Sequence, residues 1–373
     1  MVAKNIRYLG IKELYSLRRD GMLMFLIAYS FTLSIWIIAK SAPEILNKTP
    51  IGIVDMDQSR LSQRIVDAFY PPRFAPPAML TIDEMDTRLD QGVDTFALNI
   101  SPHFERDVLA GRDPSLQLNV DATRIGQALI GNGNIQTIVN DEIDTFVQGY
   151  RSGAPHPVDL DPRVRFNPNL YKPWFAGVIG LIDQVTILAV VLTGAALIRE
   201  REHGTIEHLL VMPVTPFEIM MSKIWSMGVV VVAATGLSLV FVIRLVLSVP
   251  LQGSIALFLA AAAMHVFATT SLGIFLATFA RTMPQFGLML MMVLLPLNML
   301  SGGMTPRESM PAVVNFIMLF APTTHFVGLA KAILFRGAGF SVVWPQLLAL
   351  AAIGTAFFIP SLTRFRKTIG TMA

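Results

Sequence analysis

Residues 173–198 read PWFAGVIGLIDQVTILAVVLTGAALI, an apolar run in which Asp183 is the only charged residue. A helix of about 20 apolar residues crosses the roughly 30 Å hydrocarbon core of a bilayer, so this run predicts a membrane span. The whole chain of 373 residues shares this character, since 53% of it is hydrophobic and only 15% is charged. A soluble globular domain carries about 25% charged residues. The sequence therefore predicts an integral membrane protein.

Five further apolar runs are long enough to predict the remaining spans. They are expected over residues 21–39, 224–248, 254–280, 285–303 and 342–363. The turn signal VPLQG at 249–253 separates the third span from the fourth. The predicted fold class is a polytopic α-helical membrane protein with six transmembrane helices.

The uncharged run 309–330 allows two interpretations. Pro311 and Pro322 limit its apolar stretch to about ten residues, which is too short to cross a bilayer. We interpret it as part of an external, re-entrant segment over 304–341, and a seventh span stays as the alternative.

Basic residues gather at four places beside the predicted spans. They are Lys4, Arg7, Lys12, Arg18 and Arg19 before the first span, Arg199, Arg201 and Lys223 between the second and third, Arg281 between the fourth and fifth, and Arg364, Arg366 and Lys367 in the tail 364–373. With six spans all four groups fall on one side, which the positive-inside rule makes the cytoplasm. Both termini are therefore expected in the cytoplasm. Basic residues lead directly into a full-length first span, as in an uncleaved anchor.

The segment 40–172 differs in charge from the rest of the chain. It holds 13 Lys and Arg against 18 Asp and Glu, whereas the remaining residues hold 16 basic against 8 acidic residues. Its place between the first and second spans makes it external. Strand-like runs at 51–54, 95–100 and 116–120, mixed with helical patterns, predict a small periplasmic α+β domain.

The helices of this domain are expected to follow recognisable caps. Ser59 and Thr81 stand in N-cap positions, and Ser101-Pro102 places a proline at a first helical position. A longer helical pattern over 125–150 is interrupted by Gly131-Asn132-Gly133-Asn134.

Asp55 and Asp57 are the acidic pair of this domain that most resembles a reactive site. They could act as a metal or acid–base pair, but a strand-end turn with a helix cap explains them better. His103 and His156 have no partner at metal-ligand spacing, and the chain has no cysteine to supply a thiolate. We therefore predict no catalytic, cofactor-binding or metal site.

The loop 199–223 between the second and third spans reads REREHGTIEHLLVMPVTPFEIMMSK. It predicts a helix end, a glycine break, a short amphipathic helix, and a new helix opened by a Thr215–Glu218 capping box with Pro216 at its first position. A plain connector needs only a few polar residues. We interpret the loop as a contact for a soluble partner, and an ordinary interfacial helix stays as the alternative. His203 and His208 lack the HExxH spacing of a zinc site.

At this loop the sequence resembles a known family. Residues 202–210, EHGTIEHLL, followed by Pro213 and Lys223, resemble the coupling-helix signature of ABC-2 type permeases, the membrane subunits of ATP-binding-cassette exporters. Segments 55–59, 102–104 and 120–123 resemble the periplasmic domain of that family, and 300–306 and 321–326 resemble its fifth-span exit and the segment behind it. The resemblance implies an N-terminal interfacial helix over 1–20. It also implies these ATPase-coupling residues: Glu202, Gly204, Thr205, Glu207, Leu209, Leu210 and Pro213.

The resemblance also implies partners and a location. It implies a second permease chain in a homo- or heterodimer, two ABC ATPase subunits, and commonly a HlyD-like periplasmic adaptor at the bacterial inner membrane. The chain has no G-x-x-x-x-G-K-[ST] phosphate loop, so ATP and Mg are expected on the partner subunit and none on this chain. A net charge of only +3 does not predict nucleic-acid binding. The expected cargo is a hydrophobic or amphipathic compound, drug-like or lipid-like.

The candidate pathway residues are Asp183, Arg244 and Met292. Asp183 is the acid within the second span and Arg244 lies near the outer end of the third, so they could pair along a pathway or each reach the interface. Met292 belongs to a group of methionines in the fifth span, which could line a hydrophobic path or simply pack helices.

Two other classes of protein remain as alternatives. An ion-driven secondary transporter needs several buried acids or histidines, and the spans offer only Asp183 and His265. A membrane-anchored receptor or scaffold needs neither six spans nor a structured inner loop.

Overall fold

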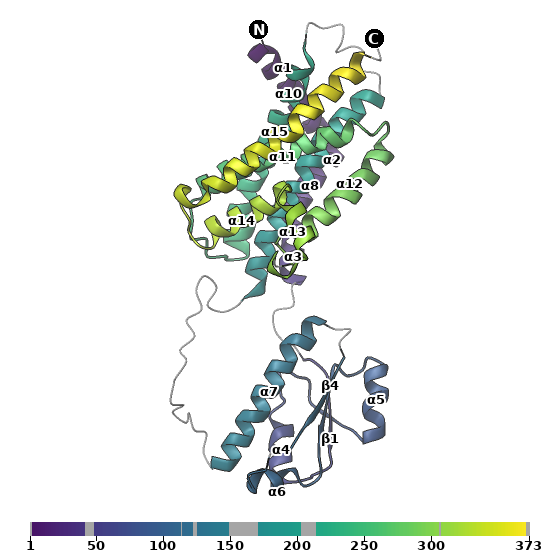
Figure 1. Cartoon of the computed structure of the whole chain (residues 1–373), viewed down its shortest axis with the longest axis vertical. Helices are drawn as coiled ribbons and strands as arrows, with labels where there is room; N and C mark the ends of the chain where they lie inside the picture. The colour runs from purple at the N-terminus through teal and green to yellow at the C-terminus, as the bar shows by residue number, and fades with distance from the viewer. Residues whose placement is uncertain are drawn as a thin grey trace. The chain divides into compact units, whose positions relative to one another are not determined.

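The structure is a computed structural model that describes residues 2–41, 48–112, 114–121, 125–148, 171–202, 214–305 and 307–370. The chain divides into two compact units, one made of residues 1–42 and 165–373 and the other of residues 43–164. The first unit is helical and the second holds a small sheet (Figure 1). We describe each unit by itself.

The described residues of the helical unit form α-helices with two π-helical stretches and one 3-10 turn. In chain order they are α1 (Val2–Arg19), α2 (Gly21–Tyr29), η1 (Ser30–Ser34), α3 (Ile35–Ser41), α8 (Lys172–Glu202), α10 (Pro216–Ser238), η3 (Leu239–Val246), α11 (Ile255–Ala277), α12 (Met283–Met299), η4 (Arg307–Ser309), α13 (Ala312–Met318), α14 (Pro322–Leu334) and α15 (Phe340–Gly370). Of these, α2 to α3 and α10 to η3 each form one continuous candidate span.

Five helices of the described residues are long and apolar enough to cross a membrane, or up to six if a bent pair counts as one span. The bent pair is α13 and α14, which meet at 84°. This bend separates the run 309–330 into two short helices and does not support a straight seventh span. The predicted fold class is thus confirmed in its coarser form, as a mostly helical polytopic membrane protein.

Several helix bounds differ from the sequence-based expectation. The predicted fifth span over 285–303 is the 17-residue helix α12, which ends at Met299, just before a turn in which Gly302 adopts a φ of 88°. The predicted loop 199–223 is helical at both ends, because α8 continues to Glu202 and α10 already begins at Pro216. The last helix, α15, continues past 363 into the expected tail.

The centre of the helical unit is formed by α8 and α11. α11 packs against α8, α10, α14 and α15, and α8 also packs against α3 and α12. A Cβ at Gly273 of α11 would lie 2.7 Å from the carbonyl oxygen of Val190 on α8. Glycine therefore allows the two backbones to approach closely.

The second unit is an α+β fold around a four-stranded sheet. The strands are β1 (Ile51–Asp55), β2 (Ala78–Met79), β3 (Phe96–Ile100) and β4 (Gln117–Val120), in the order β2-β1-β3-β4. β1 pairs in parallel with β2 and β3, and β3 pairs antiparallel with β4. The three predicted strands are confirmed. β2 was not predicted, because two residues carry no alternating pattern.

In the part of this unit that the structure describes, the helices beside the sheet are α4 (Arg60–Asp67), α5 (Ile82–Asp90), α6 (Phe104–Leu109) and α7 (Ile125–Gln148). The caps at Ser59 and Thr81 are confirmed. The placement of Pro102 at a first helical position was wrong, because α6 begins at Phe104 after His103, whose φ is 65°. The interruption of the long helix was also wrong. α7 runs unbroken through Gly131, which lies against the ring of Phe96, so packing on the sheet outweighs the low helix propensity of glycine.

Candidate coupling site and transport pathway

The loop with the predicted coupling signature lies mostly outside the described residues, which stop at Glu202 and resume at Val214. The predicted coupling residues outside them are Gly204, Thr205, Glu207, Leu209, Leu210 and Pro213. Glu202 is described, and its Oε1 accepts a hydrogen bond of 2.8 Å from the backbone N–H of Met283. The end of α8 is therefore bonded to the beginning of α12.

On the other side of the loop, α10 begins with the predicted capping box. The hydroxyl of Thr215 accepts a hydrogen bond from the N–H of Glu218, and Glu218 Oε2 accepts one of 2.6 Å from the N–H of Thr215. The other carboxylate oxygen, Oε1, accepts a 3.0 Å hydrogen bond from Asn5 Nδ2 on α1. The cap is confirmed, and the structure adds that it also holds the N-terminal helix.

A cluster of four charged side chains joins α1, α8 and α10 beside the loop. The ammonium of Lys223 on α10 lies 3.2 Å from Glu13 Oε1 on α1 and 2.8 Å from Glu200 Oε2 on α8. Lys12 adds contacts of 3.2 Å to Glu200 and 3.6 Å to Glu13. The side chain of Lys223 is only 1% exposed. We call these four residues the ion cluster.

The ion cluster is balanced, with two ammonium groups and two carboxylates. Burial alone lowers the pKa of Lys12, but the carboxylates of Glu200 and Glu13 outweigh it and raise the pKa above its ordinary value. Lys12 therefore stays protonated at neutral pH. Lys223 is the buried lysine of the cluster, and it needs these carboxylates because an unpaired charge away from water is costly.

Further polar contacts tie the neighbouring helix ends together. Asp20 caps α2 by accepting a hydrogen bond from the N–H of Leu23, and its other oxygen pairs with Arg199 of α8 at 2.8 Å. Arg201 donates a 2.6 Å hydrogen bond to the carbonyl of Ala280, just after α11. The described helices on either side of the loop, α8 and α10, are thus held together with α1 and the start of α2 by polar contacts.

Sequence reasoning found only part of this site. It singled out Lys223 as a signature position and Glu202 as a coupling residue, but it missed Glu13, Glu200 and Lys12. One signal was present, since Glu13 is the only acid of α1 and lies on the same face as the buried Gly10 and Leu17. Nothing in the sequence indicates that it meets α8 and α10.

Of the two possibilities left open for Asp183 and Arg244, the structure does not show the ion pair. Asp183 is half-buried, Arg244 is exposed, and no ion pair joins these two described residues. Three residues after Asp183 on α8, the hydroxyl of Thr186 lies 2.9 Å from Nε2 of His265 on α11. His265 is buried. Its ring stacks on Phe326 of α14 with a centroid distance of 4.1 Å.

The methionines of α12 fall into two groups. Met283 and Met289 pack against the core of the helical unit. Met292 is 76% exposed, and Met291 and Met299 are also exposed. Packing within this chain therefore does not explain Met292, whose side chain is open to lipid or to another chain.

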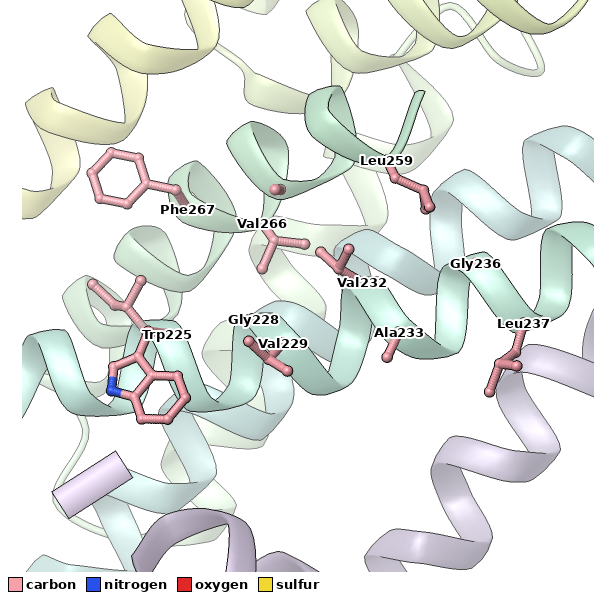
Figure 2. Close-up of a pocket in the computed structure, with 12 residues that line it drawn as sticks. Trp225, Gly228, Val229, Val232, Ala233, Gly236, Leu237, Leu259, Val266 and Phe267 are labelled. Carbon is pink, nitrogen blue, oxygen red and sulfur yellow. The ribbon is translucent and has the colours of Figure 1, made fainter. Parts of the chain in front are cut away.

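An apolar groove of about 770 Å³ runs between α10 and α11 (Figure 2). Its walls carry no charged residue and include Val229, Val232 and Leu237 of α10 with Leu259 and Phe267 of α11. Gly228 and Gly236 of α10 also line the groove, and because they have no side chain they leave its space open. The volume falls in the range of about 300–1,000 Å³ that is typical of small-molecule sites.

Comparison with known proteins identifies the family. The model of the family described as "ABC-2 family transporter protein" matches residues 21–362, which is most of the chain. The chain is an ABC-2 family transporter permease. This confirms the resemblance that the loop signature suggested.

The relatives of the permease are named as transport proteins. It is 62% identical over 370 residues to the "Inner membrane transport permease YhhJ" of Escherichia coli K12, which covers 99% of each chain. It is 25% identical over 364 residues to the "Probable multidrug ABC transporter permease YbhR" of the same organism, covering 96% of this chain and 97% of that protein. A 28% identity over 208 residues links it to YbhS, covering 54% of this chain and 53% of that protein. These names and the apolar helices show a membrane-embedded transport permease.

Proposed function

We propose that the permease is the membrane subunit of an ATP-driven exporter and receives its energy from a separate ABC ATPase at the loop 199–223. ABC-2 permeases generally work with such a subunit, and the chain belongs to that family. The observation that carries the proposal is the polar network that joins α1, α8 and α10 beside the loop. A contact surface that must transmit force needs a rigid base, and a plain connector does not.

The proposed mechanism divides the work between two kinds of chain. ATP and Mg bind to the partner, and closure of the partner subunits displaces the loop helix at 205–210. Because the ion cluster fixes α8 to α10, both helices tilt together and change access to the pathway. In this arrangement the N- and C-termini lie in the cytoplasm, and residues 40–172 form the periplasmic domain.

The proposed cargo is a hydrophobic or amphipathic compound. The groove between α10 and α11 supports this class, since it is apolar and large enough for a small molecule. The word "multidrug" in the name of YbhR points the same way. Asp183, Arg244 and Met292 stay candidate pathway residues. We further propose that two permease chains associate, and that a HlyD-like adaptor joins them in the periplasm.

Charge reversal in the loop tests the docking role. We expect Glu202→Lys together with Glu207→Lys to reduce the ATPase that co-purifies with the tagged permease by at least about tenfold, which corresponds to about 1.4 kcal/mol of binding free energy. Glu207→Lys alone avoids breaking the bond between Glu202 and Met283 and should give a smaller loss. Asp86→Lys, on the exposed face of α5, is the matched charge reversal outside the loop.

Transport and ligand-binding assays on the purified permease, beside the co-purification, distinguish the two alternatives. Transport by the purified chain without any nucleotide-hydrolysing partner would favour an ion-driven transporter. Unchanged ATPase recovery with the double variant would contradict docking at this loop. Binding of a periplasmic ligand with no transport at all would favour a receptor.

A further inference from the structure

A second cavity of about 330 Å³ lies in the helical unit at the end where α8 begins. Figure 1 shows α13 and α14 toward this end, away from the chain termini. Three cationic side chains line the cavity, Arg307, Lys331 and Arg336, and no acidic side chain is among the described residues that line it. Along α8 it lies about 37 Å from the ion cluster, at 1.5 Å per residue between Phe175 and Glu200. It is therefore separate from the coupling site.

The cations of this cavity present donors from two segments of the chain. Arg307 uses two of its donors on Asn315 Oδ1, at 3.0 and 2.6 Å, so an uncharged group orients the guanidinium without neutralising it. Lys331 of α14 donates to the carbonyl of Gly302, and its ammonium also lies 4.9 Å from the ring centre of Phe175. Arg336, just after α14, is exposed at the rim. Arginine forks and lysine ammonium groups are the side chains that bind phosphate oxygens best.

The first turn of α14 adds an independent sign of a ligand. Thr324 is only 3% exposed, and its hydroxyl has no hydrogen-bond partner among the described residues. The neighbouring Thr323 shows the usual arrangement, because its hydroxyl donates to the carbonyl of Leu297. A buried hydroxyl without a partner is costly, so one in a cavity wall indicates a missing acceptor. The N-terminus of α14 also favours an anion at this place.

The cavity also has an apolar side. Phe175 is 40% exposed, Met304 is 75% exposed, and Val327 completes this side. A free inorganic ion needs no such surface, whereas the alkyl part of an amphiphile does. Cations at the rim and apolar groups beside them therefore match a phosphate that is attached to a hydrocarbon chain.

We propose that this cavity, formed by Arg307, Lys331, Arg336 and the first turn of α14, binds the phosphate headgroup of a membrane amphiphile. The site binds the anion and performs no chemistry on it. It does not depend on the proposed export function, since binding is measured on the permease alone.

Native mass spectrometry of the full-length permease in detergent tests the site. The probes are phosphatidylglycerol, which carries the anionic phosphate, phosphatidylcholine, whose phosphate is balanced by a cation, and inorganic phosphate as a competitor. We expect wild-type protein to retain phosphatidylglycerol over phosphatidylcholine. Arg307→Gln with Arg336→Gln should weaken that retention at least about tenfold, as expected for lost charge-assisted hydrogen bonds.

Matched variants separate the site from general charge and from folding. Lys172→Gln removes a cation at the same end outside the cavity lining and should retain the lipid as wild type does. Arg336→Gln alone touches no described hydrogen bond, so it serves where the double variant unfolds. Glu308 follows Arg307 in the chain, and its side chain lies outside the described residues. Glu308→Gln should bind at least as tightly as wild type.

Three outcomes would overturn the proposal. Equal retention by wild type, Arg336→Gln and the double variant shows that the cavity is not the site. An equal loss with Lys172→Gln shows only a general effect of charge. Retention of inorganic phosphate without any preference for phosphatidylglycerol overturns the assignment to an amphiphile and assigns a free anion.

Discussion

At the scale of single residues, the buried ammonium of Lys223 predicts a large effect on the stability of the helical unit. Its ammonium is nearly inaccessible and lies within 3.2 Å of both Glu13 and Glu200, whereas that of Lys12 lies 3.6 Å from Glu13. We expect Lys223→Met to lower the stability of the permease by about 3 kcal/mol, because two carboxylates stay buried with one partner removed. Thermal unfolding in detergent measures this change.

Lys12 provides the control for that prediction. It contacts the same two carboxylates, but its side chain is 54% exposed. Lys12→Met should therefore cost less than about 1 kcal/mol, since water replaces an exposed partner. Equal losses for the two variants would show that burial of Lys223 is not the cause.

The hydrogen bonds of Asp57 predict that the stability of the α+β unit around α6 depends on pH. Its Oδ2 accepts a 3.0 Å hydrogen bond from the N–H of Glu105, at the start of α6. Burial raises the pKa of Asp57, but hydrogen bonds from Ser59 and from the backbone of α6 outweigh it and lower the pKa. These hydrogen bonds fit the helix-cap interpretation of Asp57. The described residues hold no cluster of three or more metal-ligating side chains.

The sign of the effect follows from the lowered pKa. The stabilisation is complete above the unfolded pKa of about 3.9 and is lost as the pH falls through the folded value. Hydrogen exchange of peptides from α6, corrected for intrinsic rates, should therefore show less protection as the pH falls from about 5 to about 3. Asp57→Asn should flatten this dependence, and Asp90→Asn, on an exposed position of α5, should not.

At the scale of elements, the close approach of α8 and α11 decides the packing of the helical unit. Gly273 faces the backbone of Val190, which cannot move aside as a side chain could. We expect Gly273→Ala to destabilise the permease by about 1–3 kcal/mol through overpacking. Gly287→Ala on α12 is the matched control, because a Cβ there has no neighbour within 4 Å. Alanine favours a helix over glycine, so this control should unfold at or above the wild-type temperature.

At the scale of the whole molecule, the proposed topology places the two units in different surroundings. The chain contains no cysteine, so single cysteines can be introduced without removing any. We expect Thr87→Cys on α5 to react with a membrane-impermeant maleimide when the outer surface of the inner membrane is exposed in spheroplasts. Ser16→Cys on α1 should react only after the membrane is opened. The reverse pattern would contradict the orientation and place the loop 199–223 away from any cytoplasmic ATPase.

The sequence by itself determined the membrane class, most of the spans, three strands and the capping boxes. These features depend on the spacing of apolar residues along the chain and on contacts between residues three or four positions apart. Such residues are close together because they are neighbours in the sequence. The family followed from a local signature in the same way. The lengths of the helices were less predictable, because α12 already ends at Met299 within an apolar run, whereas α8 and α15 continue into polar sequence.

Only the tertiary structure decided which distant groups meet. Glu13, Glu200 and Lys223 come from three segments, and no spacing in the sequence relates them. The same holds for the cavity that brings Phe175 next to Lys331 and Arg307. It also holds for the unbroken α7, where the ring of Phe96 occupies the space that Gly131 leaves open. Packing sets such contacts, and packing depends on how whole helices and strands fit together and not on the order of neighbouring residues.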